Sequence, residues 1–311
     1  ALAAEQLAEK SRCDIVTEAT ARYFDLLSTD ASVAIIEDDW RLTQDYEKQL
    51  EGAVTAGTAF RADLLRVKTQ VSRAKLAIRQ EQEKRDLAAA ALAESLRLPA
   101  ESELRPAKAD LVPVRLNGKT GVATLITQAK QHRPELKAAG AATTAAQLES
   151  DRARIAPMIP NLQAGYGAGG LGGGFGNNTG NFEDTQDFYI GLGWKIGPGG
   201  LFDKQRRVIA NAREEATSLQ TEQIKAAIGR EVVEAAAKSQ SAHDQIAIND
   251  EAVAAAEEMV KLAKERQASQ LGVVLEYLLA REELTRARQS RVKAVTDFNK
   301  AQHELRRAVG K

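Results

Sequence analysis

The chain has 311 residues, a formal net charge of zero, 28% charged residues and 5% aromatic residues. This length allows one or two ordinary domains, and the balanced charge excludes a global field that would attract nucleic acid. Abundant alanine with few aromatic residues is typical of long helices with small core side chains. The single cysteine, Cys13, excludes an internal disulfide bond. No apolar run reaches the roughly 18 residues of a transmembrane helix.

Residues 1–98 are expected to form a long antiparallel helical hairpin. Apolar residues recur at steps of three and four along its first part, which predicts a helix of about 50 residues. That helix is predicted to break at Val54–Thr58, because Gly57 can adopt the positive φ that ends a helix. A second helix is predicted from Arg61 to Leu98, where Pro99 follows. Its heptad seam consists of Leu64, Val67, Val71, Ala74 and Ile78.

Residues 99–120 are predicted to be irregular, since they contain three prolines and the turn pair Asn117-Gly118. The segment is expected to lie against the helices, because its apolar residues need cover: Leu111, Val112, Val114 and Leu116. Helical periodicity returns over residues 121–156. It is interrupted at His132–Pro134, and Pro134 is acceptable in the first turn of the next helix.

Residues 157–203 differ from the rest of the chain. Fourteen of the 22 glycines lie between Gly165 and Gly200. Two flanking runs, Asn161–Tyr166 and Phe188–Ile196, predict the strands of one β-hairpin around a glycine-rich loop. One face of the second strand is predicted to carry Phe188, Ile190, Leu192 and Trp194.

Residues 204–311 predict a second long helical hairpin. Its helices are expected at about Phe202–Gln270 and Val273–Val309, with a break at Gly272. Two turn segments match one another with a slip of one residue: Val54–Leu65 and Ala268–Leu279. The long hairpin therefore occurs twice with a strand pair between, which indicates an internal repeat.

The chain resembles the TolC-like outer-membrane efflux protein family over essentially all 311 residues. The matching segments, in order, are Ala21–Leu27, Ala56–Leu65, His132–Lys137, Arg154–Leu162 and Gly199–Asp203. The resemblance implies a mainly α fold: very long antiparallel helical hairpins in two repeats, forming an α-barrel protomer, with strands that contribute to a membrane β-barrel. It implies five parts: a first helical hairpin at 1–98, an irregular equatorial segment at 99–120, helices leading to the membrane at 121–156, a β-hairpin with a glycine-rich extracellular loop at 157–203, and a second helical hairpin at 204–311.

The family pattern normally begins with a further helix and strand pair ahead of the motif at Tyr23-Phe24. Only one strand pair is found in this sequence, and no signal peptide is recognisable. We therefore interpret the chain as N-terminally truncated. Three such chains would supply six strands where the family barrel has twelve, and open strand edges in lipid cost several kcal/mol per unpaired group. We expect this chain alone not to complete the membrane barrel.

The resemblance implies a passive duct without catalysis. It would export small molecules, such as drugs, metals or other toxic compounds, from an inner-membrane pump and a periplasmic adaptor to the outside. It implies a homotrimer in outer-membrane lipid of a Gram-negative bacterium, with most of the chain in the periplasm and no nucleic-acid partner. Opening would be a rotation of the helical hairpins. The alternatives are a type I protein secretion duct and a soluble coiled-coil scaffold protein, and the β-hairpin argues against the scaffold.

The resemblance also implies that the adaptor docks on the two hairpin tips. The expected docking residues are Gly57, Thr58, Ala59 and Asp63 at the first tip and Gly272, Val273 and Val274 at the second. The best-known family member has aspartates six and nine residues beyond the second turn glycine, where this chain has Leu278 and Arg281. The candidates for an acidic entrance gate are instead Asp63, Glu276, Glu282 and Glu283. The candidate aromatic residues of the membrane strands are Tyr166, Phe188, Tyr189 and Trp194.

Three catalytic or ligand-binding patterns are rejected. Gly165–Gly170 satisfies G-x-G-x-x-G, but a further strand follows, whereas a dinucleotide site needs a helix N-terminus at that point. A nucleotide-binding enzyme is the weaker alternative, which a thermal-shift screen with nucleotides would test. The three histidines, His132, His243 and His303, are dispersed and predict no metal site. No catalytic triad can be proposed, so we expect no catalytic residue, cofactor or metal.

Overall fold

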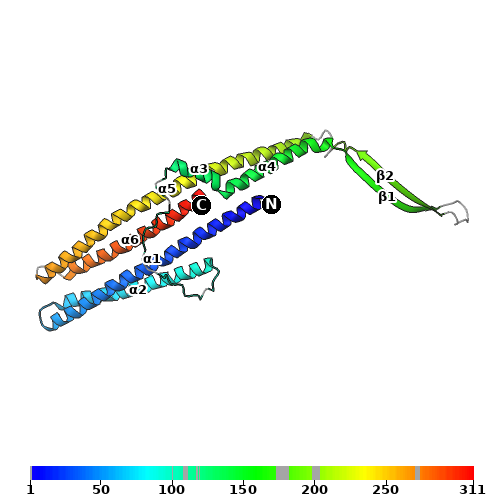
Figure 1. Ribbon diagram of the computed structural model, residues 1–311. Coiled ribbons are helices and arrows are strands. Elements are labelled where there is room, and N and C mark those ends of the chain that lie inside the picture. The colour runs from blue at the N-terminus through cyan, green and yellow to red at the C-terminus, as the bar shows by residue number, and fades with distance from the viewer. Residues whose placement is uncertain are drawn as a thin grey trace. The chain divides into compact units, whose positions relative to one another are not determined.

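The computed structural model of the chain describes residues 2–99, 101–107, 111–116, 118, 120–172, 182–197, 204–269 and 274–311. The chain divides into two compact units. One comprises residues 1–6 and 135–225, and the other comprises residues 7–134 and 226–311. The secondary structure consists of α1 (Leu2–Thr55), α2 (Arg61–Ser95), α3 (Val122–His132), α4 (Pro134–Ile155), the short 3₁₀ helix η1 (Ala156–Met158), β1 (Asn161–Gly172), β2 (Phe182–Gly193), α5 (Lys204–Ala268) and α6 (Val274–Val309) (Figure 1).

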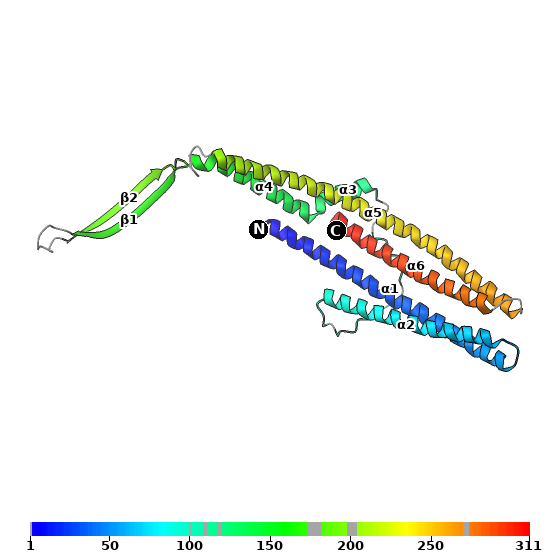
Figure 2. The same cartoon turned by 180° about the vertical axis from the view of Figure 1, so that it is seen from behind.

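The second unit contains four long helices in the lateral order α2, α1, α6, α5, which is visible from both sides (Figures 1 and 2). Ion pairs join each helix to the next. Arg22 of α1 binds Glu94 of α2 at 2.9 Å. Arg307 of α6 binds Asp14 of α1 at 2.6 Å. Arg291, which is also on α6, binds Asp250 of α5 at 2.5 Å. Helices far apart in the sequence therefore lie side by side in this unit.

The turn between α1 and α2 is a Schellman motif, as the glycine at position 57 predicts. Gly57 has a φ of 76°. Its N–H donates to the Val54 carbonyl at 3.1 Å, and the Thr58 N–H donates to the Ala53 carbonyl at 2.9 Å. These two bonds satisfy carbonyl groups that the helix end leaves without partners. The turn therefore ends α1 with its Ala53 and Val54 carbonyl groups paired.

The interruption between α3 and α4 has a local cause in Pro134. Arg133 adopts an extended conformation, with φ −61° and ψ 122°, because the residue before a proline is disfavoured in the helical region. Pro134 is then the first residue of α4, a position where its missing N–H costs nothing. The predicted break at this point is confirmed.

Two apolar clusters among the described residues of the four-helix unit join different helices. One joins α1, α2 and α6 through Leu50, Leu64, Val67 and Leu278. The other joins α5 and α6 through Ala242, Ile246, Ala294, Val295 and Phe298. Alanine allows the helix backbones to approach closely, so the core is thin and consists of many small contacts.

The irregular segment 111–116 lies against α6, as expected, although Val112 is wrongly predicted to need cover and is 60% exposed. Leu111 packs on the cluster of α5 and α6. The segment is held by the fully buried Asn299. Its Oδ1 accepts from the Val114 N–H at 2.7 Å, and its Nδ2 donates to the Val112 carbonyl at 2.9 Å. The Leu116 N–H also donates to Gln302 Oε1 at 3.1 Å, so backbone hydrogen bonds to two side chains of α6 hold the segment without burial of every apolar residue.

The other unit contains α4 beside the first part of α5, followed in space by one antiparallel strand pair (Figure 2). Ser150 of α4 donates to Asn211 of α5 at 2.9 Å. The strands pair from Asn161↔Gly193 to Gly172↔Phe182 and have 12 residues each. Both extend farther into the glycine-rich stretch than predicted, because a ladder of backbone hydrogen bonds needs no side chains. The remaining predicted loop, residues 173–181, lies outside the described residues.

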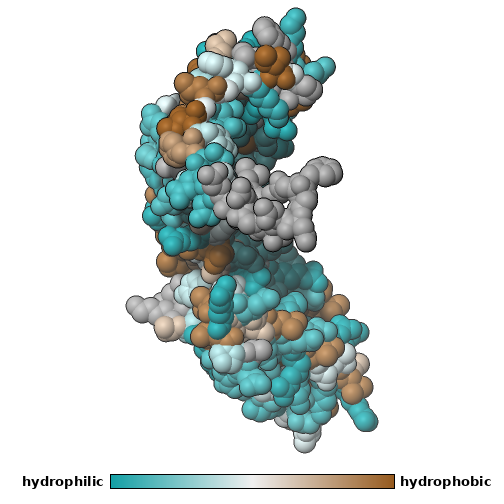
Figure 3. Space-filling model, turned by 90° about the vertical axis from the view of Figure 1, so that its right-hand side faces the viewer, coloured by the Kyte–Doolittle hydropathy of each residue, from teal (hydrophilic) through white to brown (hydrophobic). Residues whose placement is uncertain are grey.

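No helix in the described part of the chain combines the length and apolar character needed to cross a membrane. Hydrophobic side chains are nevertheless present on the surface, where they lie among hydrophilic ones on the face seen in Figure 3. The exposed leucines of α2 lie along one face of that helix, and so do the large exposed hydrophobic residues of α5 within the four-helix unit.

Candidate functional site

The first hairpin tip presents an exposed aromatic residue that the sequence analysis missed. Gly57 and Thr58 are exposed, whereas Ala59 is partly covered and packs against the cluster that contains Leu50 and Leu64. Phe60 follows with 79% of its surface exposed. The sequence did contain a signal for this exposed residue. Phe60 lies between the turn glycine and the next helix, and no side chain of the turn can cover its ring.

Asp63 lies one turn into α2 and is not the N-cap. The N-cap is Phe60, which makes no side-chain capping hydrogen bond. The Asp63 carboxylate instead accepts from Arg66 at 2.9 Å and is 22% exposed. A carboxylate at this position could cap the helix or form an ion pair, and Asp63 forms the ion pair.

The second tip is described only in part. Gly272 and Val273 lie outside the described residues. Val274 packs against the cluster formed by Leu50, Leu64, Val67 and Leu278, so it contributes to the core between the two hairpins. Arg266 at the end of α5 binds Glu276 in the first turn of α6 at 2.6 Å.

Each of the four candidate gate acids has an arginine partner. Besides Asp63 and Glu276, the α6 pair Glu282 and Glu283 lies 2.6 and 3.9 Å from Arg286. Positively charged arginine side chains of the same chain therefore compensate the negative charge of these carboxylates. Because the arginine of each pair is more than half exposed, each pair contributes little to stability.

A buried arginine lies where the resemblance would have predicted an acid. Arg281 of α6 and Asp39 of α1 have side chains only 10% and 12% exposed. The Asp39 Oδ1 accepts from Arg281 Nη2 at 2.5 Å and from Nε at 3.0 Å, and the Asp39 carbonyl accepts from Nη2 at 3.2 Å. Burial alone would lower the pKa of the Arg281 guanidinium, but hydrogen bonds to Asp39 and Tyr277 raise it above its ordinary value.

An aromatic pair lies beside this ion pair. Tyr46 of α1 and Tyr277 of α6 meet edge to face with their ring centroids 5.1 Å apart, and the Arg281 guanidinium lies 5.9 Å from the Tyr277 ring centroid. Gln267 of α5 donates to the Tyr46 hydroxyl, while burial raises the pKa of that hydroxyl. Side chains of α1, α5 and α6 thus form one continuous polar junction near the tips.

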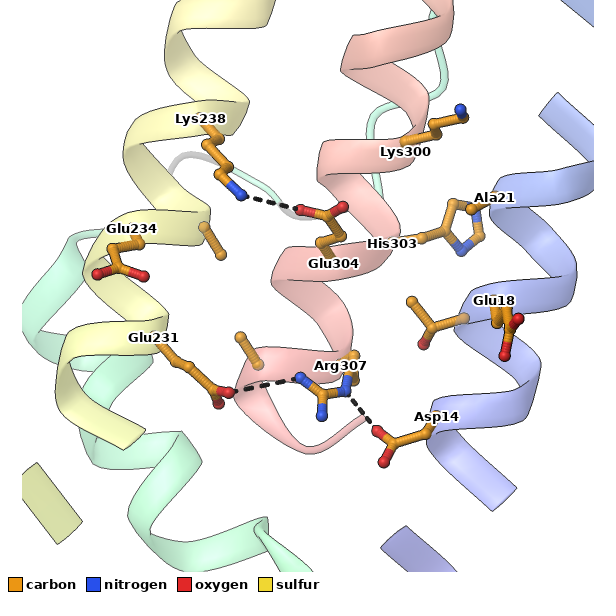
Figure 4. Close-up of a pocket in the computed structure, with 13 residues that line it drawn as sticks. Asp14, Glu18, Ala21, Glu231, Glu234, Lys238, Lys300, His303, Glu304 and Arg307 are labelled. Carbon is orange, nitrogen blue, oxygen red and sulfur yellow. Dashed lines mark hydrogen bonds and ion pairs between the residues drawn. The ribbon is translucent and has the colours of Figure 1, made fainter. Parts of the chain in front are cut away.

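A charged pocket of about 460 Å³ lies farther from the tips, between α1, α5 and α6. In Figure 4, Arg307 extends between Asp14 and Glu231, and Lys238 faces Glu304. Arg307 binds these two acids at 2.6 and 3.6 Å, and Lys238 lies 3.8 Å from Glu304. These ion pairs join α6 to α1 on one side and to α5 on the other, so they hold the three helices together.

His303 lines the same pocket but is suited to packing. Its ring lies 5.8 Å from that of Phe24 on α1. Burial lowers the pKa of the imidazole, and the charge of Arg306 lowers it further. The neutral ring is therefore the favoured form at neutral pH. Among the described residues, no group of three histidine, cysteine or acidic side chains is arranged to hold a metal ion.

The strand pair has two chemically different faces. The register places Leu162, Ala164 and Tyr166 opposite Leu192, Ile190 and Phe188 on one face. The other face carries Asn161, Gln163, Gly165, Gly167 and Gly169, opposite Gly193, Gly191, Tyr189, Asp187 and Thr185. Over these pairs the first face is apolar, and beyond Tyr166 and Phe188 it continues with Ala168 opposite Gln186 and Gly170 opposite Asp184. The other face is polar or bare around Tyr189.

The four candidate strand aromatics do not share one face. Tyr166 and Phe188 are direct cross-strand partners on the apolar face, and Tyr189 lies on the opposite one. Trp194 lies just beyond the end of β2, where its Nε1 donates to the Met158 carbonyl at 3.3 Å. Alternation in the sequence was sufficient to separate Tyr189 from the other aromatic residues.

Comparison with known proteins gives a consistent result. The family model for outer membrane efflux proteins matches residues 125–311. No curated protein sequence matches significantly. The fold is similar to a membrane protein from Pseudomonas aeruginosa, with a TM-score of 0.80 and 20% identity over 99% of this chain and 71% of that one.

Two further solved structures share the fold. The outer membrane protein VceC from Vibrio cholerae has a TM-score of 0.79 and 20% identity, over 99% of this chain and 72% of that one. The MtrE outer membrane channel of Neisseria gonorrhoeae in its open state has a TM-score of 0.79 and 18% identity, over 99% of this chain and 68% of that one. Both matches extend across the helices and the strand pair.

Proposed function

Because this chain belongs to the outer membrane efflux protein family, we propose that it forms a passive export duct in the outer membrane. It would receive small molecules from an inner-membrane pump through a periplasmic adaptor and release them outside. The transport energy would come from the pump, since a duct needs only an open path.

The observation that carries this proposal is the two-faced strand pair. Its apolar face, with Leu162, Tyr166, Phe188, Ile190 and Leu192 exposed, suits contact with lipid. Its opposite face, with Gln163, Asp187 and several glycines, suits a water-filled interior. Alternation of apolar outside and polar inside is the pattern of membrane β-barrels, so we propose that copies of this hairpin contribute to one barrel.

The partner chains are proposed to be further copies of this one, in a trimer. The outer helix α2 exposes Leu65, Leu76 and Leu87, which are spaced by three helical turns and lie within an arc of roughly 40°. The opposite side of α2 carries the buried residues Leu64, Val67 and Ala74. A helix with apolar residues on two opposite sides is built to pack between two neighbours, and this chain covers only one side.

The other outer helix has a matching second face. Within the four-helix unit, α5 exposes Val233, Ile248, Met259 and Leu262 along one arc of roughly 80°. Its buried residues, such as Val232 and Ile246, lie on the opposite side. Since α2 and α5 are the two ends of the row of helices, α2 of one copy can pack on α5 of the next. Such head-to-tail contacts close into a ring.

Assembly and conduction test this proposal together. The complete gene product in detergent should be a trimer by native mass spectrometry and should form channels in planar lipid bilayers. Leu76→Glu should yield monomers without channels, because it places a charge in the apolar contact. The adjacent exposed Lys75→Glu is the matched control and should remain trimeric and conducting. A monomeric wild type, or a trimeric Leu76→Glu variant, would contradict the interface.

The hairpin tips are proposed as the docking site for the adaptor, with Gly57, Thr58, Ala59 and Asp63 joined by the exposed Phe60. The second tip would contribute Gly272, Val273 and Val274. An acidic entrance formed by Asp63, Glu276, Glu282 and Glu283 remains a proposal of the same kind, to be tested by the cation selectivity of their glutamine and asparagine variants.

Gly57→Val should abolish crosslinking between this tip and the adaptor in cells. Valine is strained at a φ of 76°, so the turn would have to change shape. Gly52→Val, at a helical position with no neighbouring atom within 4 Å, introduces the same side chain without that strain. Equal crosslinking of both variants would refute docking at this turn.

A further inference from the structure

Tyr189 is the one large ring that the register places on the polar face of the described strand pair. Along its own strand it is followed on that face by Gly191 and Gly193, and its cross-strand partner is Gly165. The ring therefore has bare backbone on two sides, across the strand pair and along its own strand. Its neighbours on this face are otherwise short or polar.

The Tyr189 ring lies directly across the backbone of Gly165. A Cβ atom added at Gly165 would lie 2.5 Å from ring atoms Cε1 and Cζ and 2.6 Å from the hydroxyl oxygen. Real Cβ atoms do not approach other heavy atoms so closely, so any other residue at this position would displace the ring. An aromatic ring that covers a cross-strand glycine is a known device of β-sheets, and here it turns the ring along the sheet.

The glycines beside this pair do not share the contact. An added Cβ at Gly167, Gly191 or Gly193 would meet no atom within 4 Å. The close approach is therefore specific to Gly165, although Gly167 occupies the same strand and the same face. The two glycines differ in their cross-strand partner, which is Tyr189 for Gly165 and Asp187 for Gly167.

We propose that Gly165 and Tyr189 form a positioning pair that sets the free width of the duct inside the membrane. This inference rests on the proposed function, in which the polar face lines the interior. With glycine at position 165, the ring lies along the wall and leaves the path open. Any side chain at that position turns the ring into the path, and each copy of the chain in the assembly narrows it once.

Single-channel conductance of the complete gene product in planar lipid bilayers tests this pair. Gly165→Ala should lower the conductance, whereas Gly167→Ala, which adds the same methyl group to the same face, should leave it unchanged. Gly165→Ala combined with Tyr189→Ala should conduct as Tyr189→Ala alone does. The largest neutral polymer that enters the channel should be smaller for Gly165→Ala than for Gly167→Ala or the wild type.

The outcomes separate the two proposals. A wild type without channels overturns the proposed function and this inference with it. Equal conductance of Gly165→Ala and Gly167→Ala would overturn the positioning pair but leave the proposed function standing. The same holds if Gly165→Ala combined with Tyr189→Ala conducts less than Tyr189→Ala alone. If Gly165→Ala fails to assemble, adding Tyr189→Ala should restore assembly, because it removes the clash. An unrestored variant contradicts the pairing.

Discussion

Replacing Arg281 by alanine is expected to lower the free energy of unfolding by about 3 kcal/mol or more. The change leaves the Asp39 carboxylate, which is only 12% exposed, without its two guanidinium hydrogen bonds. An unpaired buried charge costs far more than the net worth of the ion pair. Urea denaturation followed by circular dichroism at neutral pH measures the difference.

Arg288→Ala is the matched control for this effect. Arg288 lies on the same helix and binds Glu257 at 2.9 Å and Asp38 at 3.9 Å, but these side chains are 39%, 52% and 50% exposed. Its loss should therefore cost less than about 1 kcal/mol. Replacing both Arg281 and Asp39 by leucine should restore much of the stability, since no buried charge remains. Equal losses for Arg281→Ala and Arg288→Ala would refute the burial argument.

Asn299→Leu is expected to cost about 3 kcal/mol, although leucine has the branched shape of asparagine and the same number of side-chain heavy atoms. The Val114 N–H and the Val112 carbonyl would lose their partners, at about 1–3 kcal/mol for each group that stays out of water. Residues 112–114 should then loosen from α6, while the Leu116 N–H can still donate to Gln302. Hydrogen exchange followed by mass spectrometry should show faster exchange at Val114 and its neighbours.

A second asparagine provides the comparison. Asn249 of α5 donates to the Gln245 carbonyl at 2.7 Å within its own helix, and this bond lies at the surface. Asn249→Leu should change stability by no more than about 0.5 kcal/mol and leave exchange in segment 111–116 as in the wild type. Unchanged exchange in Asn299→Leu would contradict this role of Asn299 and would mean that the packing of Leu111 and the bond from the Leu116 N–H to Gln302 hold the segment.

Local chemistry made much of the fold predictable. The turn at Gly57 and the break at Pro134 each follow from backbone restrictions that a residue imposes on itself and its neighbours. The periodicity of apolar residues identified the long helices for the same reason. These features need no information about distant parts of the chain.

The candidate site was less predictable, because its contacts join distant residues. Arg281 and Asp39 are separated by 242 residues, and each alone is typical of a solvated helix face. The strand ends were also missed, since Gly167 and Gly169 pair through the backbone and offer no side-chain pattern. The close contact between Tyr189 and Gly165 required the register, which fixes partners that alternation alone cannot identify.

The position of α1 between α2 and α6 has a consequence for the order of folding. Its partner α2 follows at once in the chain, and their hairpin can form early from local contacts. The contacts of α1 with α6 span up to 293 residues, and such long closures are slow because chain entropy is lost before contacts form. During synthesis, Phe24 lacks its partner ring at His303 until almost the whole chain has been made. The side of α1 that α6 covers in the folded chain therefore stays exposed until α6 has been made, and exposed apolar surface of this kind favours aggregation.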